Sequence, residues 1–268
     1  MATSQRVECA KSRSIAGVAD QFETLTPTGE GANEASELVA QLNLGAPATG
    51  DRPRLVAAMI ASADGRAAVD GRAGGLGSPP DRAILRELRC AMDAVLVGPT
   101  TLIEERYSSL LDDEHRERRL SSGRPAEPIT ATISRKLDPR LEELNLFATP
   151  DQPIVIYTES ADEMTSHGAD IQVQRLEPGQ LSLAGCLEDL HANHGVQTLL
   201  SEGGPTLLRA LVSEGLVDDF VFTVSPLLVS GSGTNLISGD TFDPPVGLDL
   251  QNVWKSQNFL FLHYTRQR

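Results

Sequence analysis

The sequence predicts a three-layer α/β/α fold: a mixed, mostly parallel central sheet with helices on both faces and an antiparallel C-terminal edge. Strand-like and helix-like stretches alternate from about residue 54 to residue 214, the order typical of parallel sheets covered by helices. The chain then ends in two long strand-like stretches, 217–231 and 252–266, and the second contains a hairpin pattern. Long consecutive strands of this kind indicate that the edge of the sheet becomes antiparallel.

The first 50 residues differ from the rest of the chain. They are rich in Ser, Thr, Gly, Ala and Glu and show little apolar periodicity. We therefore expect a mobile N-terminal extension over 1–50, with a short helix over 34–42, and a folded domain over 51–268.

The folded domain begins with a strand, a helix and a second strand. The apolar stretch 54–65 ends in an Asp-Gly turn, and 93–98 reads as a buried strand. Between them, 78–90 has the chemistry of a helix start: Ser78 as N-cap, two prolines in the first turn and Asp81 at the capping-box position. The apolar face of this helix is formed by Ile84, Leu85 and Leu88.

The remaining elements follow the same alternation. A strongly charged helix is expected over 100–119. Further strands are expected over 128–134, 153–158, 170–176 and 196–202, and further helices over 181–192 and 205–214, the last ended by Gly215.

Composition and charge exclude several classes of protein. The net charge of −14 argues against a nucleic-acid partner, which requires a basic surface. No apolar run is long enough for a membrane helix and no secretory signal is visible, so we expect a cytoplasmic protein without a membrane partner. The three cysteines lack metal-ligand spacing, and no metal is expected.

Arginine is concentrated in one part of this acidic chain. Residues 52–140 carry 15 of the 23 Lys and Arg against 13 of the 37 Asp and Glu, so this segment is near +2 and the rest near −16. Such a local excess suits a small anionic ligand, although a solvated surface explains it equally well.

The stretch LLSEGGPT at 199–206 places a glycine-rich turn between a strand and a helix. Glycines allow a ligand to approach the backbone, and the first N–H groups of a helix favour an anion. This turn therefore predicts a phosphate site, against the alternative of a tight turn that binds nothing.

Three stretches together resemble a known family. LLSEGGPTLLRALVSEGLVDDFVFTVSPLLVSG, RPRLVAAMIASADGRAA (52–68) and LRCAMDAVLVGPTTLIEERY (88–107) are similar in order and spacing to the riboflavin-biosynthesis pyrimidine reductases, that is, the RibD C-terminal domain. The resemblance covers about 52–265 and implies the dihydrofolate-reductase fold. It also implies reduction of 5-amino-6-(5-phosphoribosylamino)uracil or a related aminopyrimidinone by NADPH, and a homodimer joined through its C-terminal strands. The apolar stretch 258–264 is a candidate for that interface, with an ordinary core strand as the alternative.

The resemblance also implies a cofactor site. The dinucleotide phosphates would be held by Gly203, Gly204, Pro205 and Thr206. The turn after the second strand would also face NADPH, through Gly98, Thr100 and Thr101. The adenosine 2′-phosphate would be met by Ser134 and Arg135, for which a basic surface cluster is the alternative.

The catalytic candidates are two carboxylates at strand ends. Asp64 suits hydrogen bonding to a ring amide or a proton relay, and Glu202 suits contact with substrate. Both have structural alternatives, turn formation for Asp64 and helix capping for Glu202. The resemblance adds Arg89, Glu105 and Leu76 as further substrate-binding candidates.

The chain departs from the family pattern in three ways. It lacks the motifs of a zinc deaminase domain, GGLGSPP replaces a Trp-Ile-Thr run, and EERYSSLLDDEHRERR replaces the usual Asp-Pro-x-Leu-x-x-Arg segment. The candidates for contact with the ribose phosphate are then Arg116, Arg118 and Arg119. Two further hypotheses stay open: dihydrofolate reduction, because a pterin presents the same amide and amino edge, and an NADPH sensor without turnover.

Overall fold

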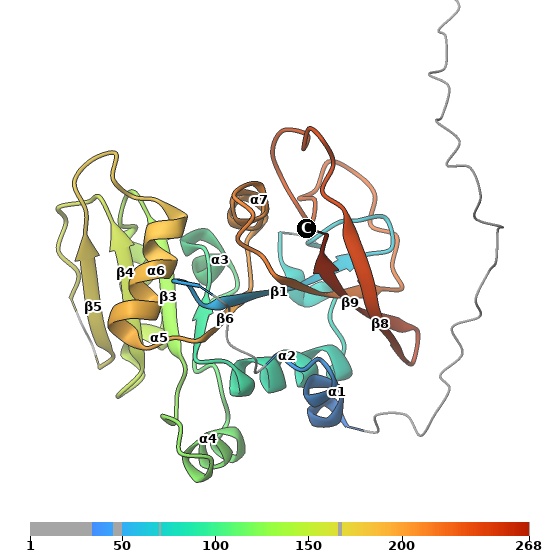
Figure 1. The fold of residues 1–268 in the computed structure, drawn as a ribbon, viewed down its shortest axis with the longest axis horizontal. Helices are drawn as coiled ribbons and strands as arrows, with labels where there is room; N and C mark the ends of the chain where they lie inside the picture. The colour runs from blue at the N-terminus through green and yellow to red at the C-terminus, as the bar shows by residue number, and fades with distance from the viewer. Residues whose placement is uncertain (1–33, 45–49, 70, 166–167, 268) are drawn as a thin grey trace, which may run out of the picture.

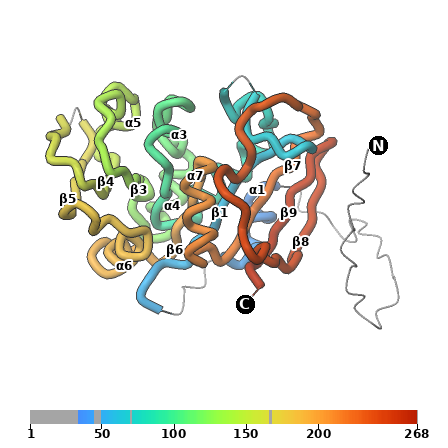
Figure 2. The backbone as a smooth tube through the Cα atoms, turned by 90° about the horizontal axis from the view of Figure 1, so that it is seen from above, coloured from blue at the N-terminus to red at the C-terminus, as the bar shows by residue number. Residues whose placement is uncertain are grey.

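A computed structural model of the chain describes residues 34–44, 50–69, 71–165 and 168–267. One nine-stranded sheet runs through the molecule with helices on both sides, as Figures 1 and 2 show. The predicted three-layer α/β/α fold is therefore confirmed. Within the described residues, no helix has the length and apolar character needed to cross a membrane.

The strand order explains the mixed character of the sheet. The order is β5 (Asp170–Arg175), β4 (Pro153–Thr158), β3 (Ile129–Ser134), β2 (Ala94–Leu96), β6 (Thr198–Ser201), β1 (Arg54–Ser62), β7 (Asp219–Ser225), β9 (Phe259–Arg266) and β8 (Leu248–Ser256). All pairs from β5 to β7 are parallel, whereas β9 pairs antiparallel with β7 and β8. The predicted antiparallel C-terminal edge is confirmed.

Two apolar cores hold the layers together, one on each face of the sheet. On one face lie α1 (Ala35–Gln41), α2 (Pro79–Ala91), α3 (Pro99–Glu104) and α5 (Asn145–Ala148), together with the 3₁₀ helix Pro139–Glu143. On the other face lie α6 (Leu183–His194) and α7 (Pro205–Ser213). A further short 3₁₀ turn, Ala73–Gly75, precedes α2. Helix α4 (Asp113–Ser121) packs beside α2. Because the parallel strands are covered on both faces, β2 and β6 are buried along their whole length.

Helix α2 starts as the sequence predicts. Pro79 and Pro80 occupy the first turn, and the Ser78 hydroxyl accepts a 3.3 Å hydrogen bond from the amide of Asp81. The carboxylate of Asp81 does not complete a capping box; it is hydrogen-bonded to Thr223 on β7 instead.

The single charged helix expected over 100–119 is wrong. The structure has two helices, α3 and α4, separated by residues 105–112. Arg106 turns the chain with a φ of 52°, and the buried Leu110 and Leu111 anchor the connection in the core. The charged residues continue across this break, and for that reason the pattern predicted one continuous helix.

The long strand expected over 217–231 is also shorter than predicted. Strand β7 ends at Ser225, directly before Pro226, which has no amide hydrogen for a sheet ladder. The segment that follows is a loop held by Asp64 and Arg66.

The helix expected near 34–42 is present as α1. Its Leu38 and Val39, together with Leu42 and Leu44 beyond its end, join the core against α2, so part of the predicted extension packs on the domain. Residues 1–33 of that extension lie outside the described residues.

Candidate active site

A cavity of about 390 Å³ lies at the carboxyl edge of the parallel strands. One side is formed by β1 and β7, where Ile60 and Thr223 are paired in register and both line the cavity. Helix α2 forms a second side, and the turns after β2 and β6 contribute Thr101 and Gly204. Ligands of open α/β sheets bind outside the carboxyl ends of the strands, so this is the expected place for a site.

One face of α2 forms one wall of the cavity. Asp81, Ile84, Leu85, Leu88 and Arg89 all line it, and their spacing of three, one, three and one places them on one helical face. The wall therefore carries the carboxylate of Asp81 and the guanidinium of Arg82 at its N-terminal end, apolar side chains in its middle, and the guanidinium of Arg89 at its C-terminal end.

Glu202 lies at the end of the cavity formed by Arg89. Its carboxylate accepts two hydrogen bonds of 2.6 Å from Arg89 and one of 2.5 Å from the hydroxyl of Tyr107. The guanidinium of Arg89 also lies 5.5 Å from the centre of the Tyr107 ring, within the range of a cation–π contact. The structure thus brings together Arg89 and Glu202, both predicted, and adds Tyr107.

Burial and charge set the protonation of this network. Burial lowers the pKa of Arg89, but the charge and hydrogen bonds of Glu202 outweigh it, so the net effect is a raised pKa. Burial and then the charge of Glu202 raise the pKa of Tyr107 well above its usual value. Arg89 therefore stays protonated, and Tyr107 stays a neutral hydrogen-bond donor.

Asp64 occupies a different environment from the one its predicted role requires. The carboxylate is exposed outside the cavity lining and accepts hydrogen bonds from the Ser62 hydroxyl (2.5 Å) and from the amides of Val229 (3.1 Å) and Ser230 (2.7 Å). The Ser62 hydroxyl, followed by these amides, lowers the pKa of Asp64 to about 2. These contacts favour the structural alternative, in which Asp64 shapes the turn and fixes the following loop.

The two remaining substrate candidates differ in position. Glu105 lines the cavity, and its Oε1 accepts a 2.7 Å hydrogen bond from the amide of Ala73. Leu76 is only 1% exposed and is not among the described residues that line the cavity, so its side chain contributes to the core.

The two predicted cofactor turns contact each other. Strands β2 and β6 are neighbours, and the amide of Gly98 donates a 2.7 Å hydrogen bond to the carbonyl of Gly203. A Cβ on Gly204 would lie 2.5 Å from the Thr101 hydroxyl, and the peptide between Gly203 and Gly204 is cis. A side chain at residue 204 would therefore force the Thr101 hydroxyl to move.

These turns suit a phosphate ligand. Helices α3 and α7 begin at Pro99 and Pro205, and their N-cap residues, Gly98 and Gly204, have no side chain to cap the first amides. Thr100 and Thr206 follow these prolines on the exposed side of their helices. Two adjacent helix starts with uncapped amides fit a dinucleotide diphosphate.

The residues expected near an adenosine 2′-phosphate lie further along the same edge. Ser134 ends β3, next to β2, and its hydroxyl donates a 2.5 Å hydrogen bond to the carbonyl of Lys136. Arg135 is 80% exposed, and its nearest carboxylate oxygen, on Glu159, is 3.9 Å away. Its guanidinium is thus available to a ligand.

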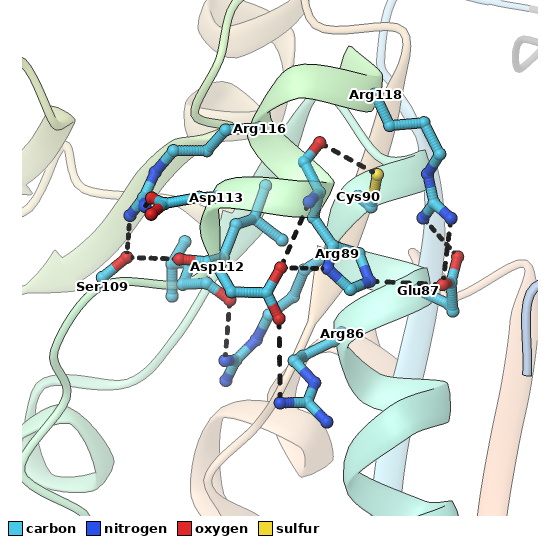
Figure 3. Close-up of polar contacts among 12 residues, drawn as sticks. Arg86, Glu87, Arg89, Cys90, Ser109, Asp112, Asp113, Arg116 and Arg118 are labelled. Carbon is cyan, nitrogen blue, oxygen red and sulfur yellow. Dashed lines mark hydrogen bonds and ion pairs between the residues drawn. The ribbon is translucent and has the colours of Figure 1, made fainter.

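The arginines of α4 are already engaged within the protein. Figure 3 shows Arg116 beside Asp113 and Ser109, and Arg118 beside Glu87. The third arginine, Arg119, is buried and donates to the carbonyls that end α2, Cys90 and Met92. None of the three lines the cavity, so Arg89 is better placed for the ribose phosphate.

Sequence reasoning missed several residues of the cavity, among them Tyr107 and Asp81. It treated Tyr107 only as part of a departure from the family pattern and Asp81 only as a helix-capping acid. A signal for Asp81 was present, because eight residues separate it from Arg89 and a helix places such positions on one face.

The fold and this cavity define the class: an α/β domain with a ligand site at the carboxyl edge of its sheet. The family follows from comparison with known proteins. The chain belongs to the RibD C-terminal domain family, whose model matches residues 53–262. The resemblance inferred from the three motifs is confirmed.

Similar proteins include two archaeal reductases and one solved structure. The 2,5-diamino-6-ribosylamino-4(3H)-pyrimidinone 5′-phosphate reductase of Archaeoglobus fulgidus is 25% identical over 195 residues, covering 71% of this chain and 89% of that protein. The enzyme of the same name from Methanothermobacter thermautotrophicus is 25% identical over 221 residues, covering 80% and 98%. A pyrimidine reductase-like protein from Corynebacterium diphtheriae has a TM-score of 0.70 at 24% identity, covering 88% of this chain and 99% of that one.

Proposed function

We propose that this chain is an NADPH-dependent reductase of a 6-ribosylaminopyrimidinone 5′-phosphate in riboflavin biosynthesis. The substrate is 5-amino-6-(5-phosphoribosylamino)uracil or its 2-amino counterpart. One observation carries the proposal: Thr101, Gly204 and Pro205 of the expected cofactor site line the same cavity as Arg89 and Glu202 of the expected substrate site. A donor and an acceptor of hydride need such a shared space.

The protein supplies binding and orientation, and NADPH supplies the hydride for the ring-opened ribosyl carbon. The amides of Gly203 and Gly204 and the start of α7 at Pro205 and Thr206 would hold the diphosphate, supported by Gly98, Thr100 and Thr101. The adenosine 2′-phosphate would be held by Ser134 and Arg135, which favours NADPH over NADH.

The substrate lies along α2 in this proposal. Ile84, Leu85 and Leu88 exclude water from the reacting atoms, and Arg89 presents its remaining N–H groups to the phosphate. Glu202 fixes the guanidinium through two hydrogen bonds, so its role is orientation.

The test is turnover by the purified chain. The protein is mixed with NADPH or NADH and with each ribosylaminopyrimidinone 5′-phosphate or dihydrofolate, and loss of the reduced nicotinamide absorbance is followed. We expect consumption with a ribosylaminopyrimidinone and NADPH, and slower consumption with NADH. Turnover of dihydrofolate alone would replace the proposed substrate, and cofactor binding without any turnover would indicate a sensor.

A further inference from the structure

The cavity contains a further carboxylate, Asp81, which belongs to neither the proposed cofactor turns nor the proposed phosphate site. It lies in the first turn of α2 and lines the cavity beside Ile60 and Thr223 of the sheet. In the described chain no lysine, arginine or histidine nitrogen comes within 4.0 Å of its oxygens. By contrast, the carboxylate of Glu202 accepts hydrogen bonds from Arg89 and Tyr107, and that of Glu105 accepts one from the amide of Ala73.

The surroundings of Asp81 leave it ready to accept further hydrogen bonds. Burial raises the pKa of Asp81, an effect only partly offset by the Thr223 hydroxyl and the charge of Arg82. Residue 77 is a glycine, so no side chain crowds Oδ2 of Asp81 from this direction. A Cβ at residue 77 would lie 3.1 Å from that oxygen. A carboxylate offers about four acceptor positions, and one hydroxyl uses one of them.

Hydrogen-bond complementarity selects the ligand. A 2-amino-4(3H)-pyrimidinone presents two adjacent donors, the ring N3–H and the 2-amino group, which match the two oxygens of a carboxylate. A uracil presents N3–H beside a carbonyl oxygen, and that oxygen repels a carboxylate. We propose that Asp81 binds the N3–H and 2-amino edge of the substrate, so that the chain prefers a 2-aminopyrimidinone to a uracil.

The length of the α2 wall agrees with this orientation. Asp81 and Arg89 are eight residues apart on one face, or about 12 Å along the helix axis. A pyrimidine ring at Asp81 then directs its ribose phosphate toward Arg89, past the apolar Ile84, Leu85 and Leu88. Because the orientation assumes this substrate, the inference rests on the proposed function.

The experiment exchanges the carboxylate for an amide. Asp81→Asn offers one acceptor and one donor, which complement the N3–H and carbonyl of a uracil. We expect kcat/KM for 2,5-diamino-6-ribosylamino-4(3H)-pyrimidinone 5′-phosphate to fall by about 10- to 100-fold and the preference to reverse toward the uracil. An unchanged preference, or equal losses for both substrates, would overturn the inference.

A binding measurement separates this inference from the proposed function. Calorimetric titration compares 2,5,6-triamino-4(3H)-pyrimidinone with 5,6-diaminouracil, two rings without ribose phosphate. Selectivity for the triamino ring that reverses in Asp81→Asn supports the inference even without turnover. Absence of selectivity overturns it even if both phosphorylated substrates are reduced.

Two further variants complete the design. Asp113→Asn makes the same chemical change at a carboxylate that is 95% exposed on α4, and it should keep the wild-type selectivity. If Asp81→Asn fails to fold, Asp81→Ser removes the carboxylate with a smaller side chain, and the selectivity ratio should fall to near one. A wild-type ratio in Asp81→Ser would contradict the role of Asp81.

Discussion

At the scale of single residues, the pairing of Glu202 decides what its carboxylate can do. Arg89 and Tyr107 together donate three hydrogen bonds to it, all of 2.6 Å or less. Breaking a buried charged pair leaves an uncompensated charge, so such a network is costly to disrupt. Glu202 therefore acts as an anchor between the β6–α7 turn and helix α2.

Tyr107→Phe tests this anchor. The variant keeps the ring beside Arg89 but removes one hydrogen bond to a charged acceptor, so the free energy of unfolding should fall by about 1.5–3 kcal/mol. Chemical denaturation measures the change. Tyr264→Phe is the control, because its ring packs against Phe222 and its hydroxyl makes no hydrogen bond among the described residues. Equal stability of both variants would show that the Tyr107 hydroxyl contributes nothing.

At the scale of elements, two short turns and one helix build the site. Strands β2 and β6 are adjacent, so the helices that follow them start side by side, directly after their N-cap residues Gly98 and Gly204. Helix α2 covers the neighbouring strands and contributes the long wall of the cavity. The arrangement separates two tasks, because the turns suit phosphates and the helix face suits an elongated ligand.

Gly204→Ala tests the contact between the turns. The added Cβ would lie 2.5 Å from the Thr101 hydroxyl, so we expect a loss of about 1–3 kcal/mol in stability and at least a severalfold weaker affinity for NADPH. Gly233→Ala, which has no atom within 4 Å of its Cβ, is the control. Unchanged NADPH binding in Gly204→Ala would remove this turn from the cofactor site.

At the scale of the whole molecule, charge is balanced internally more than the sequence suggests. Several arginines of the basic segment 52–140 are paired, among them Arg89 with Glu202, Arg118 with Glu87 and Arg124 with Asp93. The local excess noted in the sequence therefore provides fewer free cations than its count implies. Arg89 contributes to a ligand site through its position in the cavity.

The outer edge of the sheet supports the prediction of a homodimer. Leu250 of the edge strand β8 is 46% exposed, and Leu260 of β9 is 39% exposed. We expect a dimer in size-exclusion chromatography with light scattering, and Leu250→Glu should shift it to the monomer. Leu120→Glu on α4, where the leucine is 58% exposed, should remain dimeric. A monomeric wild-type chain would refute the dimer.

The sequence by itself determined the alternation of strands and helices, the start of α2 at Ser78 and the glycine turn before α7. These features depend on neighbours within a few residues, whose spacing matches the period of a helix or strand. The same local patterns failed at residues 105–112, where buried Leu110 and Leu111 interrupt a charged helical pattern.

Only the tertiary structure decided which carboxylates face the cavity. Asp64 is bound by Ser230, 166 positions away, and is thereby held outside the cavity lining. Arg89 meets Glu202 across 113 positions, and Asp81 meets Thr223 across the α2–β7 contact. Such pairs form because sheet order brings distant strand ends together, and no local periodicity in a single chain records that order.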